Sequence, residues 1–320
     1  MSLLQIYDFL AVELEEVREV FDGELRSDLP MIADLIEEVG KFRGKMLRPI
    51  LVLLCGRACG PINPAHRTIA AVAEMVHMAT LVHDDVLDEA DYRRRGPTLN
   101  ALHGNEAAVI MGDLCISHAF RLCSALDSPL PSRLIAATTN TLCEGELMQL
   151  YYRGHYGLTE ERYLDIITRK TAQLIATCCY LGAWASGANA AICAAFETFG
   201  LKVGMAFQIM DDILDLAGAR EGAGKTLGTD LLKEKLTLPL IHFLRQDTAR
   251  RSRLLQGLAA APDQAGRVKL LGRLDEDGSL AYARRRARLL IRDAKRALPQ
   301  IESEQSRDFL VKLADQVIGN

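Results

Sequence analysis

The stretch EMVHMATLVHDDVLDEAD, residues 74–91, ends in an acidic motif, Asp-Asp-x-Leu-Asp, that starts at Asp84. The same motif returns at Asp211, within GMAFQIMDDILDLAG at residues 204–218. In both copies the residues before the carboxylates are apolar, as on a buried helix. A packed core excludes unpaired carboxylates. Two near-identical copies therefore predict a helical protein that holds carboxylates for a functional reason.

Helical periodicity continues along the whole chain, with apolar residues at i, i+3 and i+4 between Gly/Pro-rich turns. Alternating strand patterns are absent from the sequence. We expect long helices at residues 65–90, 107–126, 131–152, 158–187 and 189–217. No composition break or linker divides the chain, so we expect one domain over residues 1–320, an all-α helical bundle with a central cleft.

Composition and charge exclude several classes of protein. The chain has 320 residues, 49% hydrophobic and 25% charged, and its net charge of −4 gives no reason to expect nucleic acid as a partner. The eight cysteines lack metal-binding spacing, which indicates reduced thiols. The N-terminal segment lacks the features of a targeting peptide, and no uninterrupted apolar run approaches the roughly 18 residues of a membrane span. We expect a soluble, cytoplasmic protein.

The spacing within each motif indicates a metal site. Residues i and i+4 share one face of a helix, so Asp84 lies beside Asp88, and Asp211 beside Asp215. Carboxylates this crowded need cations to stay ionised in apolar surroundings. All-oxygen ligands favour Mg²⁺, which is usually completed by water and substrate phosphates. The two motifs therefore predict a cleft that binds a phosphate-bearing substrate through metal ions.

Basic segments near the motifs supply phosphate-binding groups. These segments are GKMLRP (44–49), YRRRGPT (92–98), RKTA (169–172) and GAREGAGKTLGTDLLKEKLTLP (218–239). Within the last, EGAGKT is not a P-loop, because its glycines have the wrong spacing and a helix, not a strand, precedes it.

Together these residues resemble the trans-type isoprenyl diphosphate synthases, or polyprenyl synthetases. The resemblance covers nearly the whole chain and rests, in order, on GKMLRP, EMVHMATLVHDDVLDEADYRRRGPT, Gly112–Asp113, EGELMQL, KTA, AFQIMDDILD and GTDLLKEKLTLP. It implies an isoprenoid synthase fold and a homodimer. It also implies head-to-tail condensation of isopentenyl diphosphate with an allylic diphosphate, farnesyl or geranyl, assisted by Mg²⁺, for which Mn²⁺ could substitute.

The resemblance also implies site residues. The implied metal ligands are Asp84, Asp85, Asp88, Asp211 and Asp215, with Asp212 behind them beside the basic residues. The implied allylic diphosphate ligands are Arg93, Lys170, Gln208, Lys225 and Lys235. Those of isopentenyl diphosphate are Lys45, Arg48, His77 and Arg94. Two departures bear on this assignment: Met46 stands where the family often has Arg, and the run Arg93–Arg95 leaves the alignment of its arginines open by one position.

The implied chemistry needs no nucleophile. Metal ions and cations stabilise the charge that develops on the departing diphosphate, and an apolar pocket protects the allylic carbocation from water. The double bond of isopentenyl diphosphate then attacks, and the resemblance suggests that the released diphosphate takes the proton. In this family Thr171, beside Lys170, would stabilise the cation together with nearby backbone carbonyls.

Product length depends on side chains along the helix before the first motif. Stepping back from Asp84 meets first Ala79 and Thr80, then Met75 and Val76. The family places a bulky aromatic at the position of Ala79 or Thr80 to stop growth early, and both are small here. Phe120 and Met111 are candidates for a deeper floor, with ordinary core packing as the alternative for each. We expect a long product, near heptaprenyl or octaprenyl.

Other functions stay open at this point. A synthase of shorter chains, geranylgeranyl or farnesyl, would differ only in the pocket. A class I terpene cyclase normally lacks the second Asp motif, and an HD-type metal phosphohydrolase, suggested by His83 before Asp84, would not need it. The basic C-terminal stretch ARRRARLLIRDAKR reads as a solvated amphipathic helix, with peripheral membrane contact as the weaker alternative.

Overall fold

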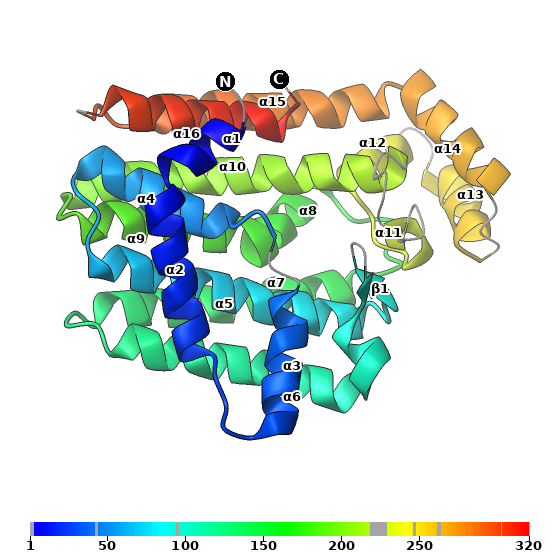
Figure 1. Cartoon of the computed structure of the whole chain (residues 1–320). Coiled ribbons are helices and arrows are strands. Elements are labelled where there is room, and N and C mark those ends of the chain that lie inside the picture. The colour runs from blue at the N-terminus through cyan, green and yellow to red at the C-terminus, as the bar shows by residue number, and fades with distance from the viewer. Residues whose placement is uncertain are drawn as a thin grey trace. The chain divides into compact units, whose positions relative to one another are not determined.

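The computed structural model describes residues 3–41, 44–93, 96–217, 229–245, 248–260, 264–301 and 303–319. Figure 1 shows the elements in chain order. In the first half of the chain they are α1 (Leu3–Phe9), α2 (Ala11–Glu24), α3 (Pro30–Gly40), α4 (Leu47–Cys59), α5 (Pro64–Leu87), β1 (Tyr92–Arg93), β2 (Gly96–Pro97), α6 (Leu99–Ser124) and α7 (Leu130–Tyr151). The second half contains α8 (Glu160–Ile167), the π-helical segment η1 (Thr168–Ala172), α9 (Gln173–Ala185), α10 (Ala190–Ala217), α11 (Thr229–Leu232), α12 (Leu238–Leu244), α13 (Thr248–Ala260), α14 (Gln264–Glu276), α15 (Ser279–Ala297) and α16 (Glu304–Val317).

The all-α prediction is confirmed, with corrections in detail. The expected helix at 158–187 is instead three consecutive pieces, because the backbone changes to π-helical pairing over Thr168–Ala172. The expected helix at 107–126 begins earlier, at Leu99, and bends at Gly104, whose φ of 85° is non-helical. A short antiparallel pair, β1 with β2, was not expected from the sequence.

The chain forms two compact units, each described by itself. The first contains residues 1–139, 174–200 and 297–313, and the second contains residues 140–173, 201–296 and 314–320. The expectation of a single domain stays a prediction.

Helix α5 is the centre of the first unit and carries the first acidic motif. It packs against α2, α4 and α6. Because it has neighbours on several sides, its apolar residues from Ile69 to Val82 are nearly all buried. Such a helix is apolar around most of its circumference, which fits the sequence pattern.

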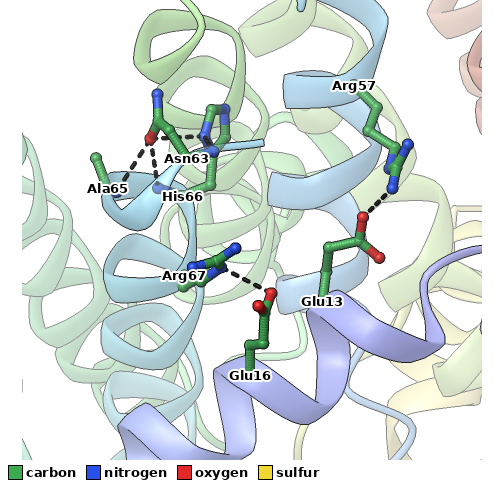
Figure 2. A network of polar contacts seen from close by, with 7 residues as sticks. All are labelled: Glu13, Glu16, Arg57, Asn63, Ala65, His66 and Arg67. Atoms are coloured by element: carbon green, nitrogen blue, oxygen red, sulfur yellow. Dashed lines mark hydrogen bonds and ion pairs between the residues drawn. The ribbon is translucent and has the colours of Figure 1, made fainter. Parts of the chain in front are cut away.

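The start of α5 is fixed by a capping box, shown in Figure 2. The Asn63 side chain accepts hydrogen bonds from the backbone N–H groups of Ala65 (3.0 Å) and His66 (3.3 Å), and His66 Nδ1 accepts one from the Asn63 N–H at 3.1 Å. The other ring nitrogen, Nε2, lies 3.1 Å from the carbonyl of Gly182 in α9. Burial lowers the pKa of His66, so the neutral ring is the form that links these two helices.

Ion pairs fix α2 within the same unit (Figure 2). Glu13 of α2 pairs with Arg57 of α4, and Glu16 pairs with Arg67 of α5 at 2.8 Å. Glu13 is buried, so its pairing removes the cost of an isolated buried charge.

The second unit is organised around Glu160 at the start of α8. Its carboxylate accepts hydrogen bonds from Tyr282 (2.7 Å) and Arg245 (3.0 Å) and pairs with Arg286 at 3.0 Å. These contacts tie α8 to the region of α12 and to α15. Helix α8 also packs directly against α12.

Two helices are long and apolar, although the sequence contains no long uninterrupted apolar run. By length and composition alone, α6 and α10 could cross a membrane. The core helices of soluble proteins meet the same criteria. One of them, α6, packs along α5.

We predict that Gly182→Ala destabilises the protein. An added Cβ at this position would lie 2.3 Å from the backbone oxygen of Val52, so α4 and α9 would have to separate. Overpacking of this kind should lower the free energy of unfolding by about 1–3 kcal/mol, measured by chemical denaturation.

The matched control is Gly23→Ala in α2, where an added Cβ has no neighbour within 4 Å. Alanine favours helix over glycine, so this change should be neutral or stabilising by up to about 1 kcal/mol. Equal stability of the two variants would contradict the close contact between α4 and α9.

Candidate active site

The first acidic motif lies at the C-terminal end of α5. Asp84 and Asp85 belong to its last turn, and Asp88 is the capping residue, with its N–H donating to the Asp84 carbonyl at 2.8 Å. The C-terminal end of a helix carries partial negative charge, which disfavours each nearby carboxylate by roughly 0.3–1 kcal/mol. Three carboxylates therefore gather where the backbone opposes them, which is the situation that a bound cation relieves.

Asp85 differs from its neighbours because it is buried and paired with Arg93. The Arg93 Nε donates to both carboxylate oxygens of Asp85, at 2.9 and 2.8 Å. The strand pair β1–β2 turns the chain back after α5 and places Arg93 there. Arg93, expected at the allylic diphosphate, is thus already engaged with an expected metal ligand.

His83 contacts the backbone of α6 instead of the acidic motif. Its Nε2 lies 3.1 Å from the Val109 carbonyl and 3.5 Å from Asp113. Gly112 makes room for the ring, since a Cβ there would lie 2.2 Å from His83 Nε2. This placement explains the Gly112–Asp113 motif and removes the observation that suggested an HD-type phosphohydrolase.

The second acidic motif lies on α10, and its middle carboxylate, Asp212, is buried. Tyr163 donates to Asp212 Oδ2 at 2.6 Å, and the Gln208 amide donates to Oδ1 at 2.8 Å. Burial raises the pKa of Asp212 to about 7, and Asp230 adds to this rise. The two hydrogen bonds and the charge of Lys170 lower the pKa. Asp212 is thus buried, and its direct hydrogen-bond partners are neutral.

Gln208 connects Asp212 to the π-helical segment. Its Oε1 accepts a hydrogen bond of 2.8 Å from the hydroxyl of Thr171, which is buried. The structure therefore brings together Thr171, Gln208 and Asp212, all of which the sequence predicts as site residues.

Lys170 is held by α7. Its ammonium group donates to Gln149 at 2.9 Å and pairs with Glu146 at 3.3 Å. Gly145 allows the close approach, because a Cβ there would lie 2.5 Å from the Lys170 backbone nitrogen. These contacts give a physical role to the EGELMQL motif.

Lys235 lies in a loop that is fixed at several points. Its N–H donates to the Asp230 carbonyl at 2.8 Å, and the Asp230 N–H donates to Asp215 Oδ2 at 3.3 Å. The neighbouring Glu234, with a left-handed φ of 53°, accepts hydrogen bonds from the Gly154 N–H (3.0 Å) and the Tyr156 hydroxyl (3.1 Å). The loop thus links Lys235 with the second acidic motif.

Three of the expected isopentenyl diphosphate residues are described: Lys45 lies just before α4, Arg48 lies in its first turn, and His77 lies on α5. Arg48 is partly buried, and its Nε has no hydrogen-bond partner among the described residues. A buried donor without a partner is unusual and is consistent with a residue that binds an anionic ligand. Burial lowers its pKa, while the nearby Glu74 raises it. Met46, at 4% exposure, belongs to the core and takes a left-handed φ of 50° at the start of α4. Methionine at this position contributes packing to the unit, not charge.

The expected chain-length residues divide by burial. Met75, Val76 and Ala79 of α5 and Met111 of α6 are buried, on two helices that pack together. Thr80 is half-buried and donates to the His77 carbonyl at 2.7 Å. Phe120 is also half-buried, farther along α6.

Some expected residues are not placed. Arg94 and Lys225 lie outside the described residues. Within the described ranges, no three His, Cys, Asp or Glu side chains form a group with the geometry of a metal site. The two acidic motifs lie on different units, so each is described with its own neighbours.

The sequence pattern missed several contributing residues. Tyr163, Gln149 and Glu146 support the expected site residues, but each does so across a long sequence separation. Glu146 and Gln149 lie within the EGELMQL motif, so the sequence indicated their region. Nothing in the sequence around Tyr163 distinguishes it from an ordinary core tyrosine.

Comparison with known proteins identifies the family. Residues 29–273 match the Polyprenyl synthetase family model. Octaprenyl diphosphate synthase of Escherichia coli strain K12 is 34% identical over 317 residues, which cover 98% of each protein. Heptaprenyl diphosphate synthase component 2 of Bacillus subtilis strain 168 is 36% identical over 245 residues, covering 77% of this chain and 70% of that one.

The fold is also found among solved structures. A polyprenyl synthase from Caulobacter crescentus CB15, complexed with calcium and isoprenyl diphosphate, superposes with a TM-score of 0.93 at 29% identity, covering 100% of this chain and 98% of that one. The match in sequence and fold agrees with the two acidic motifs and the surrounding basic residues. The chain belongs to the polyprenyl synthetase family and is a transferase of prenyl groups.

Proposed function

We propose that this transferase condenses isopentenyl diphosphate head-to-tail with an allylic diphosphate, farnesyl or geranyl, to give a long all-trans polyprenyl diphosphate. The carrying observation is the common architecture of the two acidic motifs. In each, the second aspartate is buried and paired, whereas the first and fifth are half-buried. One turn of helix separates these two, so they project together from the helix.

The residues fit a divalent cation of the Mg²⁺ type, with Mn²⁺ as a substitute. All proposed ligands are carboxylate oxygens, which hard cations prefer, and the first set crowds the negative end of α5. The proposed ligands are Asp84, Asp85, Asp88, Asp211 and Asp215. When bound, the metal would neutralise charge on the departing diphosphate.

The chain's own cations complete the anion site. Lys170 is oriented by Gln149 and Glu146, so its charge is held in one place, and the Arg93 guanidinium is held against Asp85. We assign Lys235, whose backbone N–H donates to the Asp230 carbonyl, to the same group. Such preorganised charge stabilises a leaving diphosphate without reorganisation at the moment of reaction. We assign Gln208 and Lys225 to the same group.

Isopentenyl diphosphate would bind at Lys45, Arg48, His77 and Arg94. The unpartnered Nε of Arg48 supports this assignment, because a partly buried guanidinium gains most from an anionic partner. Thr171, held by Gln208, would stabilise the carbocation with its hydroxyl oxygen.

Small buried side chains support a long product. Ala79 presents only a methyl group one turn before the first motif, and Met75, Val76 and Met111 are aliphatic. The octaprenyl and heptaprenyl synthases among the relatives point the same way. We further propose a soluble cytoplasmic homodimer that contacts the membrane only peripherally.

We predict that Asp84→Asn lowers the rate of isopentenyl diphosphate incorporation by roughly 10²–10³-fold, because the variant weakens cation binding where charge develops. The measurement is the transfer of radiolabel from isopentenyl diphosphate into chain products, with farnesyl diphosphate and Mg²⁺. A chelator should abolish incorporation by the unmodified protein, and added Mg²⁺ should restore it.

The control for this prediction is Asp91→Asn, an exposed carboxylate just after the motif, which should retain full activity. Full activity of Asp84→Asn would refute the metal assignment. A wild-type protein that releases diphosphate or a cyclic hydrocarbon, without elongation, would instead indicate a hydrolase or a cyclase.

We predict that Ala79→Tyr shortens the product to farnesyl or geranylgeranyl length. The side chain is fully buried, so a phenol ring there must take space that buried neighbours now fill, at a stability cost of about 1–3 kcal/mol. Chromatographic sizing of the dephosphorylated products measures the effect. Ala281→Tyr, the same change at an exposed position of α15, should leave product length unchanged. A long product from Ala79→Tyr would place the growing chain elsewhere.

A further inference from the structure

Tyr163 lies at one end of a hydrogen-bonded chain that runs through Asp212 and Gln208 to Thr171. Its side chain is 3% exposed and lies on α8, one element before the π-helical segment. The hydroxyl donates to Asp212 Oδ2 at 2.6 Å.

The hydrogen bonds of this chain converge on Asp212. Its carboxyl group accepts from Tyr163 on one oxygen, and the Gln208 amide nitrogen donates to the other, Oδ1, at 2.8 Å. The amide oxygen of Gln208 then points to Thr171 and accepts a hydrogen bond from its hydroxyl group, with 2.8 Å between the two oxygens. The Thr171 hydroxyl therefore donates to the protein and keeps its oxygen lone pairs for any other partner.

We propose that Tyr163 is a positioning residue for prenyl transfer. By anchoring Asp212, it holds the Gln208 amide in a single orientation, so that the Thr171 oxygen presents its negative end to the developing carbocation. The inference deepens the proposed function, because it rests on the role assigned to Thr171. Tyr163 itself contacts neither substrate nor metal in this assignment.

Burial protects these hydrogen bonds from water. Asp212 is 6% exposed and Thr171 is 9% exposed, so water competes poorly for their hydrogen bonds. If the Tyr163 hydroxyl is removed, Asp212 loses one of its two side-chain donors and can rotate. Gln208 can then turn over, and the polarity at Thr171 is no longer fixed.

The test is Tyr163→Phe, which keeps the ring and removes only the hydroxyl. We expect kcat to fall about tenfold, the scale seen when a residue supporting a site residue is lost. KM for isopentenyl diphosphate should stay unchanged, because none of the residues proposed to bind it belongs to this hydrogen-bonded chain. An unchanged kcat would overturn the proposal.

A double-mutant cycle with Thr171→Val separates positioning from general structural support. If Tyr163 acts through Thr171, the double variant should have the same kcat as Thr171→Val alone, because the chain then has nothing left to orient. If Tyr163 only stabilises the fold, the two losses should multiply. Multiplying losses would overturn the proposal.

The matched control is Tyr282→Phe, which removes another tyrosine hydroxyl bound to a carboxylate, that of Glu160, at 2.7 Å in the same unit. This variant should keep the wild-type kcat. If Tyr163→Phe has lost its helical circular dichroism at the assay temperature, Asp212→Asn replaces it in the cycle with Thr171→Val, and the same two outcomes apply. A wild type that cannot elongate would refute the proposed function, whereas an elongating wild type with an unaffected Tyr163→Phe would refute the inference alone.

Discussion

The buried second carboxylate of each acidic motif is the constraint on which both site regions depend. Asp85 is 2% exposed and Asp212 is 6% exposed. A charge removed from water costs several kcal/mol unless partners replace its hydration. Each motif meets this requirement differently: Asp85 is neutralised by a guanidinium, whereas Asp212 receives two neutral donors, and its pKa is raised to about 7.

Pairing the second aspartate also determines what the other two can do. Residues one position apart on a helix point about 100° apart, so fixing Asp85 inward directs Asp84 and Asp88 toward the half-buried side of α5. The same relation holds for Asp212 within the motif on α10. The repeated sequence therefore encodes one buried, paired carboxylate and two half-buried carboxylates. The supporting residue comes from a short hairpin in one unit and from α8 in the other.

Much of the fold and site was predictable because the signals are local. The helical period located α7 and α10 within two residues, and the acidic motifs lie at the C-terminal ends of α5 and α10, where we propose the site. What the sequence could not indicate depends on distant pairs. Tyr163 meets a residue 49 positions away. Likewise, the core position of Met46 follows from the left-handed start of α4, and no hydrophobic pattern predicts a single backbone angle.

The π-helical segment carries two adjacent proposed site residues that are held by different helices. The adjacent residues Lys170 and Thr171 have different partners: α7 holds the first through Gln149, and α10 holds the second through Gln208. The periodicity expected for residues 158–187 would have continued through this point, and π-helical pairing interrupts it. Such interruptions often occur at functional sites. Glycine at position 145 adds the close approach that lets α7 reach the interrupted backbone. The charge of Lys170 and the hydroxyl of Thr171 are thus held from separate helices, although the two residues are adjacent in the sequence.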